Sequence, residues 1–195
     1  MSEVYVLLAD GFEEIEGLTV VDLLRRADIS VETVSIMDTK TVHGSHGIPV
    51  KADVKFKNAD FKAGTMLVLP GGMPGTLNLR DHEGVQKQIL KYNKKGKQIA
   101  AICAAPTILG GLGLLEGRKA TVYPGMDDGL GGAVYKDKKV VTDGNITTGR
   151  AMGAAIPFAL RLIEILRGEE AAAKTAESIV CKEKNEEKAE SAEEK

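Results

Sequence analysis

Short apolar runs that alternate with segments of helical periodicity constrain the fold of this chain more than any other feature. Two segments have helical spacing, at about 14–27 and 83–95, and the apolar runs before, between and after them are short enough to be strands. These runs are VYVLLA at 4–9, SVETVSIM at 30–37, TMLVLPGG at 65–72 and QIAAIC from residue 98. The alternation favours a mostly parallel sheet with helices on both faces. Segments 41–56 and 135–149 contain glycine-rich turns, and we expect them to be small β pieces that decorate this sheet.

One domain accounts for most of the chain. Its 195 residues, 43% of them hydrophobic, are enough to bury a core and enclose a site. The last long helix is expected at 151–168, where apolar residues keep the helical spacing. Residues 182–195 hold four basic and six acidic side chains, and ordering them would cost more entropy than it recovers. We expect one α/β domain over 1–181 and a disordered or frayed charged tail over 182–195.

Charge and cysteine content exclude several classes of partner. With 26 Lys plus Arg against 28 Asp plus Glu, no global field favours nucleic acid or a membrane surface. The uncharged stretch at 99–115 is too short for a membrane span and contains Pro106. The N-terminal apolar run lacks a basic leader, so we expect no signal peptide and a cytoplasmic protein. Cys103 and Cys181 lie far apart, and no structural disulfide is expected.

Cys103 stands where an apolar strand meets a helix start marked by Pro106. This position places the sulfur above the carboxyl edge of the sheet, as a nucleophile elbow presents its serine. Because a helix N-terminus favours negative charge, we expect the pKa of the thiol to be lowered from its usual value of about 8.5. Cysteine is also commonly buried as a small apolar residue. The local context leaves a reactive thiol and a structural one equally open.

Backbone donors could complete a site around this sulfur. Gly71 and Gly72 end the LVLPGG run, and glycine lets bare N–H groups approach a ligand closely. With the N–H of Ala104 they could form an oxyanion hole. By itself, a tight turn that needs glycine explains the pair better.

Glu16 is the candidate acid. It lies one helical turn before Val20 on the face that carries the core stripe, so its carboxylate is predicted to point inward. Burial and a nearby thiolate would both raise its pKa, so that it stays protonated and donates a hydrogen bond to sulfur. Glu13 and Glu14 are explained as first-turn acids that complement the helix dipole, and we expect no catalytic role for them.

Five stretches together resemble the ThiJ/PfpI superfamily, and most closely its DJ-one branch, over about residues 4–173. They are GFEEIEG, LVLPGG, AAICAAPTIL, TVYPGM and TTGRAMGAA. The resemblance implies a flavodoxin-like three-layer αβα sandwich with a mostly parallel sheet, class I glutamine amidotransferase-like, and a homodimer with the active site near the interface. It makes Cys103 the nucleophilic, easily oxidised cysteine and Glu16 its partner carboxylate. Gly71, Gly72 and Ala104 match the backbone donors.

The chain departs from this family pattern at several positions. Ala104 stands where peptidase and amidase members carry His, so a peptidase would lack its base. Tyr123 stands where many branch members have His, and with a pKa near 10 tyrosine is a poorer base at neutral pH. Glu16 must then carry most of the proton transfer. Pocket residues suggested by the resemblance, including a wall changed relative to the family, are His46, Arg150, Ala151 and Met152.

Metal and cofactor sites are not expected. His43 and His46 sit three apart, but no carboxylate or cysteine completes a metal set at a recognisable spacing. No phosphate-binding loop or dinucleotide motif follows a strand.

The leading functional hypothesis is a cofactor-independent glyoxalase or deglycase. Cys103 would attack the aldehyde carbon of methylglyoxal, glyoxal or their early adducts on proteins, and Glu16 would move the proton. The alternatives are an oxidative-stress sensor, in which Cys103 oxidises to sulfinate, and a chaperone-like dimer with a vestigial pocket. A peptidase or amidase is less favoured.

Overall fold

A seven-stranded sheet forms the centre of the molecule in a computed structural model that describes residues 3–181. The predicted tail at 182–195 lies outside the described residues. The strands follow the order β10-β11-β7-β6-β1-β2-β5, and all neighbours are parallel except β10 and β11. In chain order they are β1 (Val4–Leu8), β2 (Val31–Ser35), β5 (Val54–Lys55), β6 (Met66–Leu69), β7 (Gln98–Ile102), β10 (Val140–Asp143) and β11 (Ile146–Gly149).

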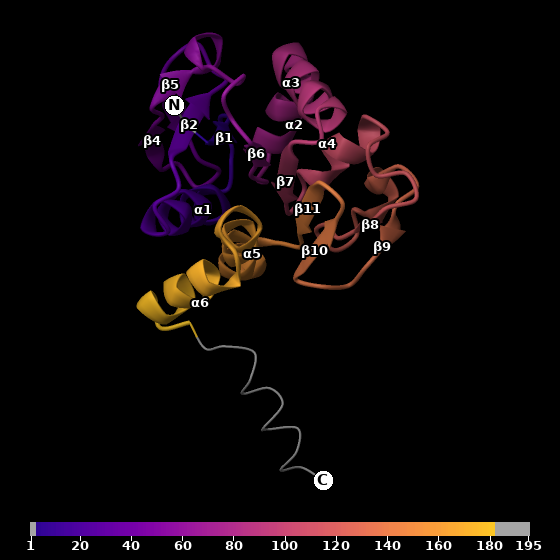
Figure 1. Cartoon of the computed structure of the whole chain (residues 1–195). Helices are drawn as coiled ribbons and strands as arrows, with labels where there is room; N and C mark the ends of the chain where they lie inside the picture. The colour runs from indigo at the N-terminus through magenta and orange to yellow at the C-terminus, as the bar shows by residue number, and fades with distance from the viewer. Residues whose placement is uncertain (1–2, 182–195) are drawn as a thin grey trace.

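Helices cover both faces of this sheet, which confirms the predicted three-layer α/β architecture. Helices α1, α5 and α6 lie on one side and α2, α3 and α4 on the other (Figure 1). Their bounds are α1 (Glu14–Arg26), α2 (Gly75–Asp81), α3 (Glu83–Lys94), α4 (Pro106–Gly111), α5 (Ala155–Arg167) and α6 (Glu169–Ser178). No helix in this part of the chain is long and apolar enough to cross a membrane.

The side chains of β1 pack alternately against the two helical layers. Val4, Val6 and Leu8 pack with α1 and α5, whereas Tyr5 and Leu7 pack with α2, α3 and α4. Successive strand residues point to opposite faces. Because both faces are covered, β1 is apolar throughout and fully buried.

The prediction that 41–56 and 135–149 only decorate the sheet is wrong in part. The first segment forms a separate hairpin, β3 (Thr41–His43) and β4 (Pro49–Lys51), but also the edge strand β5. The second supplies β9 (Val134–Tyr135), which pairs with β8 (Lys119–Ala120), and both β10 and β11. β10 and β11 carry threonine and aspartate, so they lack the apolar runs by which the other strands are recognised.

Three neighbouring strands place the candidate site residues together. β7, β6 and β1 are adjacent and parallel, so their carboxyl ends meet at one edge of the sheet. The chain continues from them into Cys103, into Gly71 and Gly72, and into α1 with Glu16. The order of strands therefore assembles residues that are far apart in sequence, at the edge where such folds bind ligands.

Neighbouring residues of α3 give a test of this packing. Ile89 is fully buried and Leu90 is 44% exposed. We expect Ile89→Ala to lower the free energy of unfolding by about 2–5 kcal/mol, because it leaves a cavity beneath the helix. The matched change Leu90→Ala should alter it by less than about 0.5 kcal/mol. Urea unfolding measures both, and equal losses would contradict the packing.

Candidate active site

Cys103 occupies a sharp turn between β7 and α4. Its φ of +64° lies in the left-handed region, which non-glycine residues rarely adopt. The turn is held from both sides: the Cys103 N–H donates to the Gly149 carbonyl at 2.9 Å, and the Tyr123 N–H donates to the Cys103 carbonyl at 2.9 Å. The side chain is partly accessible. This is the backbone geometry of a nucleophile elbow.

Glu16 reaches the same place from the first turn of α1, and its side chain is buried as predicted. The residue is 1% exposed. Its Oε2 atom accepts the N–H of Gly71 at 2.8 Å, whereas Oε1 has no hydrogen-bond partner among residues 3–181. The carboxyl group lies beside the Cys103 thiol, and each group shifts the pKa of the other.

Gly71 lies against both members of this pair. A Cβ atom on Gly71 would come within 2.6 Å of the Cys103 Cβ and 2.7 Å of Glu16 Oε2. The position therefore has to be glycine. Its N–H is already bonded to Glu16, so Gly71 orients the acid instead of acting as the predicted oxyanion donor. The N–H groups of Gly72 and Ala104 act on the sulfur instead, because both lower the pKa of the Cys103 thiol.

The titration of the pair differs from the sequence-based expectation in one respect. Burial raises the pKa of Glu16 to about 7, as expected in direction. The predicted lowering of the thiol pKa is wrong: burial first, and then the charge and hydrogen bond of Glu16, raise the pKa of Cys103 to about 12. The donors at Ala104 and Gly72 oppose this shift without overcoming burial.

The two groups are best treated as one acid that holds two protons. The first proton leaves near pH 7 because Glu16 titrates there. In the singly protonated pair, the carboxylate can accept the thiol proton while the sulfur attacks an electrophile, or Glu16 can hold the proton beside a thiolate. Protonation of Glu16 removes its negative charge, which otherwise helps to raise the thiol pKa. The pair is therefore built for proton transfer at neutral pH.

Three of the predicted pocket residues come directly after Gly149 in the sequence, and the Gly149 carbonyl accepts the Cys103 N–H. Arg150 pairs with Asp137, and Ala151 and Met152 begin the segment that leads into α5. The side chain of Met152 is 47% exposed. Tyr123 is anchored to the elbow through its backbone, and its side chain is 49% exposed.

His46 contacts Glu14 instead of the reactive pair. Glu14 is 4% exposed and binds the loop between β3 and β4: it accepts the His46 N–H at 2.8 Å, and its Oε2 lies 3.0 Å from His46 Nδ1. Although burial opposes it, hydrogen bonding to His46 holds the pKa of Glu14 at about 2. Sequence reasoning missed this role because the loop follows α1 by about 20 residues. Gly44, the first residue of this loop, is a weak signal: a Cβ atom there would come within 2.2 Å of Glu14.

A metal ion could be held by one group of side chains in the described part of the chain. Glu13, Glu14 and His46 bring their ligand atoms within 4.8 Å of one another. The fold thus places two carboxylates beside His46, for which the sequence spacing indicates no further metal ligand. The oxygens of Glu14 already accept hydrogen bonds from the loop, so we assign this group to loop anchoring.

The chain is similar to known proteins over most of its length. A model described as DJ-1/PfpI family matches residues 2–165. Protein DJ-1 homolog B of Arabidopsis thaliana is 34% identical over 92% of this chain and 42% of its own length. Parkinson disease protein 7 homolog of Danio rerio is 36% identical over 91% of this chain and 96% of its own. Deglycase PH1704 of Pyrococcus horikoshii is 32% identical over 85% of this chain and 99% of its own.

Solved structures are equally similar. DJ-1 superfamily protein STM1931 from Salmonella typhimurium, solved as a mutant, has a TM-score of 0.89 and 35% identity over 94% of this chain and 100% of its own. Toxoplasma gondii DJ-1, described as oxidised, has a TM-score of 0.88 and 36% identity over 92% of this chain and 98% of its own. The chain spans less than half the length of the Arabidopsis relatives. From the family model, the relatives and the shared fold, we conclude that the chain belongs to the DJ-1/PfpI family.

Proposed function

We propose that the chain is a cofactor-independent glyoxalase or deglycase, a lyase that acts on methylglyoxal, glyoxal or their early adducts on proteins. The observation that carries the proposal is the pairing of Cys103 with a buried acid that titrates near pH 7. Two backbone N–H groups beside the sulfur can stabilise negative charge as it develops. A relative that is named a deglycase supports the same chemistry.

The reaction needs no group besides the pair and water. The thiol proton passes to Glu16 as sulfur bonds to the aldehyde carbon, and Glu16 passes that proton on to the carbonyl oxygen, which gives a hemithioacetal and restores the carboxylate. Glu16 then removes the hydrogen on that carbon and returns a proton to the adjacent carbonyl carbon, whose oxygen is also protonated while the first hydroxyl becomes a carbonyl. This transfer through an enediol produces a thioester. Water cleaves the thioester, releasing the hydroxy acid and restoring the thiol.

The surroundings of Cys103 favour this reaction over amide hydrolysis. The residue after the nucleophile is Ala104, which offers its N–H but no base. Tyr123 is half-exposed beside the elbow, where its hydroxyl could bind a substrate oxygen. A reducing, cytoplasmic location suits a reaction that requires a free thiol.

A second function, oxidative sensing, has support in the same geometry. The donors of Gly72 and Ala104 and a protonated Glu16 could hold the oxygens of a Cys103 sulfinate. A similar protein has been solved in a form described as oxidised. The sensor would require that oxidation of Cys103 change partner binding.

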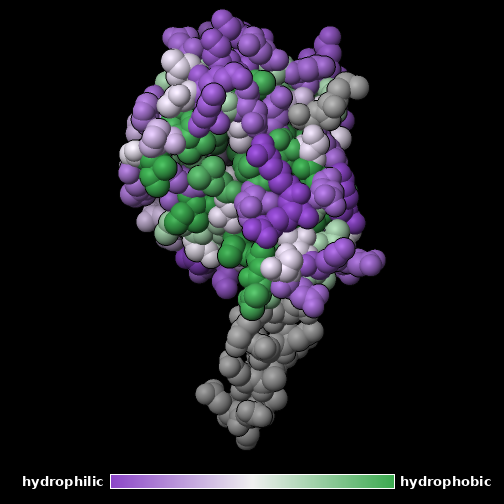
Figure 2. Space-filling model, turned by 90° about the vertical axis from the view of Figure 1, so that its left-hand side faces the viewer, coloured by the Kyte–Doolittle hydropathy of each residue, from purple (hydrophilic) through white to green (hydrophobic). Residues whose placement is uncertain are grey.

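We also propose that the chain forms a homodimer through the face that carries α1. Exposed apolar side chains gather there: Ile15 and Leu18 of α1 are 51% and 37% exposed, and Ile48 of the β3–β4 loop is 52% exposed. α1 packs on α5, whose Ile156 is also exposed. Figure 2 shows hydrophobic side chains clustered on this side of the molecule. Such patches mark interfaces when they are contiguous.

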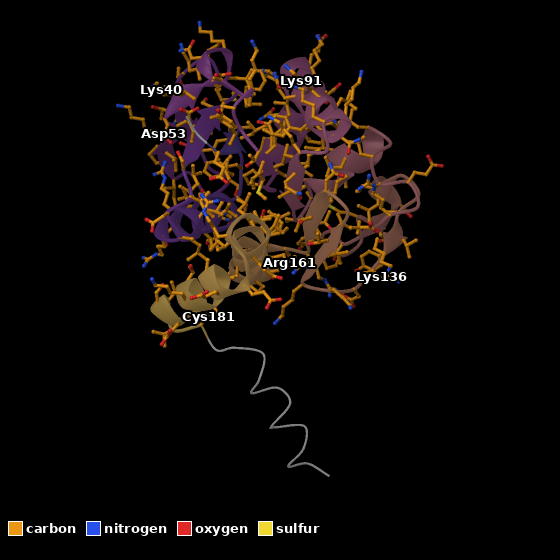
Figure 3. The ribbon with its side chains drawn as sticks, in the orientation of Figure 1. Lys40, Asp53, Lys91, Lys136, Arg161 and Cys181 are labelled. Carbon is orange, nitrogen blue, oxygen red and sulfur yellow. The ribbon has the colours of Figure 1, made fainter. Side chains whose placement is uncertain are left out.

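The chain should convert methylglyoxal to lactate without glutathione. We expect Cys103→Ser to lower the rate at least about 100-fold, because it removes the nucleophile. Cys181→Ser is the matched control: Cys181 follows α6, away from β7 (Figure 3), and its loss should leave the rate unchanged. Lactate is assayed in phosphate buffer with all variants purified identically.

Three results from this assay and two related experiments distinguish the possible functions. Absence of lactate, or equal activity of Cys103→Ser, would contradict the enzyme. Selective oxidation of Cys103 by mild peroxide in an inactive protein would favour the sensor. With a peptide adduct as substrate, lactate formed faster than the adduct releases free aldehyde would identify the chain as a deglycase.

Glu16 should set the pH at which Cys103 reacts. In a Cys181→Ser background, the iodoacetamide alkylation rate should rise with a midpoint near pH 7, where Glu16 titrates. Glu16→Gln should move this midpoint upward by at least about one pH unit, because the amide cannot accept the thiol proton while burial still raises the thiol pKa. Asp22→Asn removes an exposed charge from the same helix and should leave it in place. An unchanged midpoint in Glu16→Gln would refute the pairing.

The dimer should depend on the apolar face of α1. Sedimentation should give twice the monomer mass of 20.8 kDa for the native chain. Leu18→Glu should yield monomers because it buries a charge in the interface. Leu90→Glu, which changes a similarly exposed leucine of α3, should remain dimeric. A monomeric native chain, or a dimeric Leu18→Glu variant, would rule out this interface.

A further inference from the structure

Three hydrogen bonds close a ring around the acid of the reactive pair. The Glu13 N–H donates to the Gly71 carbonyl at 2.9 Å, and the Gly71 N–H donates to Glu16 Oε2 at 2.8 Å. The Glu16 N–H then donates to Glu13 Oε2 at 2.7 Å. The ring ties the start of α1 to the loop after β6, and Glu13 contributes both its backbone and its side chain. Displacing Glu13 would therefore loosen Glu16 from Gly71.

The side chain of Glu13 is an uncommon choice for its structural position. Glu13 is the N-cap of α1, with an extended backbone (φ −80°, ψ 120°). N-caps are usually Ser, Thr, Asp or Asn, whose short side chains reach the first free N–H groups. A neutral cap would satisfy the same N–H. A glutamate that is only 8% exposed adds a desolvated charge that capping does not require.

This charge lies beside the reactive pair. The titratable groups that act on Glu16 are Cys103 at the elbow and Glu13 at the helix start, and Glu13 raises the pKa of Glu16 further after burial has raised it. On its other side, Glu13 belongs to the group with Glu14 and His46, whose ring comes from the β3–β4 loop. His46 is exposed and paired with Glu14. Because solvent screens the His46 ring and Glu14 already pairs with it, His46 neutralises little of the negative charge of Glu13.

We propose that Glu13 is a positioning residue of the reactive pair, which holds Glu16 against Gly71 and keeps a second negative charge beside it. The inference rests on the proposed function only in treating Cys103 and Glu16 as the reactive pair. Like charges disfavour ionisation of a neighbouring carboxyl group. Glu13 therefore helps Glu16 to keep its proton up to neutral pH, where it can still exchange that proton with the sulfur.

Two substitutions separate the charge of Glu13 from its structural role. Glu13→Gln keeps an oxygen that can accept the Glu16 N–H, so the cap and the ring persist while the charge is lost. Glu13→Ala removes both. Asp22→Asn removes a charge from the same helix at an exposed position and is the control for net charge.

The decisive measurement is the pH profile of Cys103 alkylation by iodoacetamide, read by intact mass in a Cys181→Ser background. We expect Glu13→Gln to move the midpoint downward by about half a pH unit, because a like charge beside Glu16 is gone. This direction is opposite to that expected for Glu16→Gln. The melting temperature of Glu13→Gln should stay within about 2 °C of the parent, whereas Glu13→Ala should melt several degrees lower through loss of the cap.

The results would overturn the proposal in either of two ways. A Glu13→Gln midpoint that equals that of Asp22→Asn, or lies above it, would show that Glu13 does not act on the pair through its charge. A Glu13→Gln variant as unstable as Glu13→Ala would show that the side chain is structural. Because alkylation requires no aldehyde turnover, failure of the lactate assay leaves this test intact.

Discussion

The hydrogen bond from the Gly71 N–H to Glu16 is the interaction on which the rest of the site depends. It joins the carboxyl end of β6 to the first turn of α1 at 2.8 Å, and thereby holds a buried carboxyl group beside the sulfur that follows β7. Only a glycine can stand at this junction, because a side chain would collide with both Cys103 and Glu16. The parallel order of β1, β6 and β7 brings the three segments together, and this bond fixes their final alignment.

Burial of the acid has a cost for the fold. The pKa of Glu16 rises from its ordinary 4.5 to about 7, so the folded state binds this proton more tightly than the unfolded chain does. The contribution of Glu16 to stability is therefore fully present below pH 4.5 and is lost as pH rises toward 7. Its Oε1 atom is buried without a hydrogen-bond partner in the described structure, which adds to the free-energy cost of burying the ionised carboxylate. A carboxyl group with an ordinary pKa would avoid this loss but could not exchange protons near neutral pH.

Sequence patterns were sufficient to predict those parts of the fold and the site that depend on local sequence. The apolar runs identify the central strands, and the strand-to-helix transition at Cys103 predicts the elbow that its φ of +64° confirms. Helical spacing alone places Glu16 inward. The patterns failed where burial or distant contacts decide: the thiol pKa is raised because burial outweighs the N-terminus of a helix of six residues. The bond between His46 and Glu14 depends on a loop whose path no periodicity describes.

The three acids at the start of α1 illustrate why surroundings outweigh residue type. Glu14 and Glu16 are two residues apart, both nearly inaccessible, and both near the positive end of one helix dipole, which favours their ionised forms. Yet the pKa of Glu14 is about 2 and that of Glu16 about 7. Glu14 accepts hydrogen bonds from the Ser45 hydroxyl and the His46 N–H and also contacts the His46 ring, whereas Glu16 receives one backbone N–H and faces a thiol and a second carboxylate. The number of hydrogen-bond donors thus separates Glu14, which is ionised at neutral pH and anchors the loop, from Glu16, which can exchange a proton there.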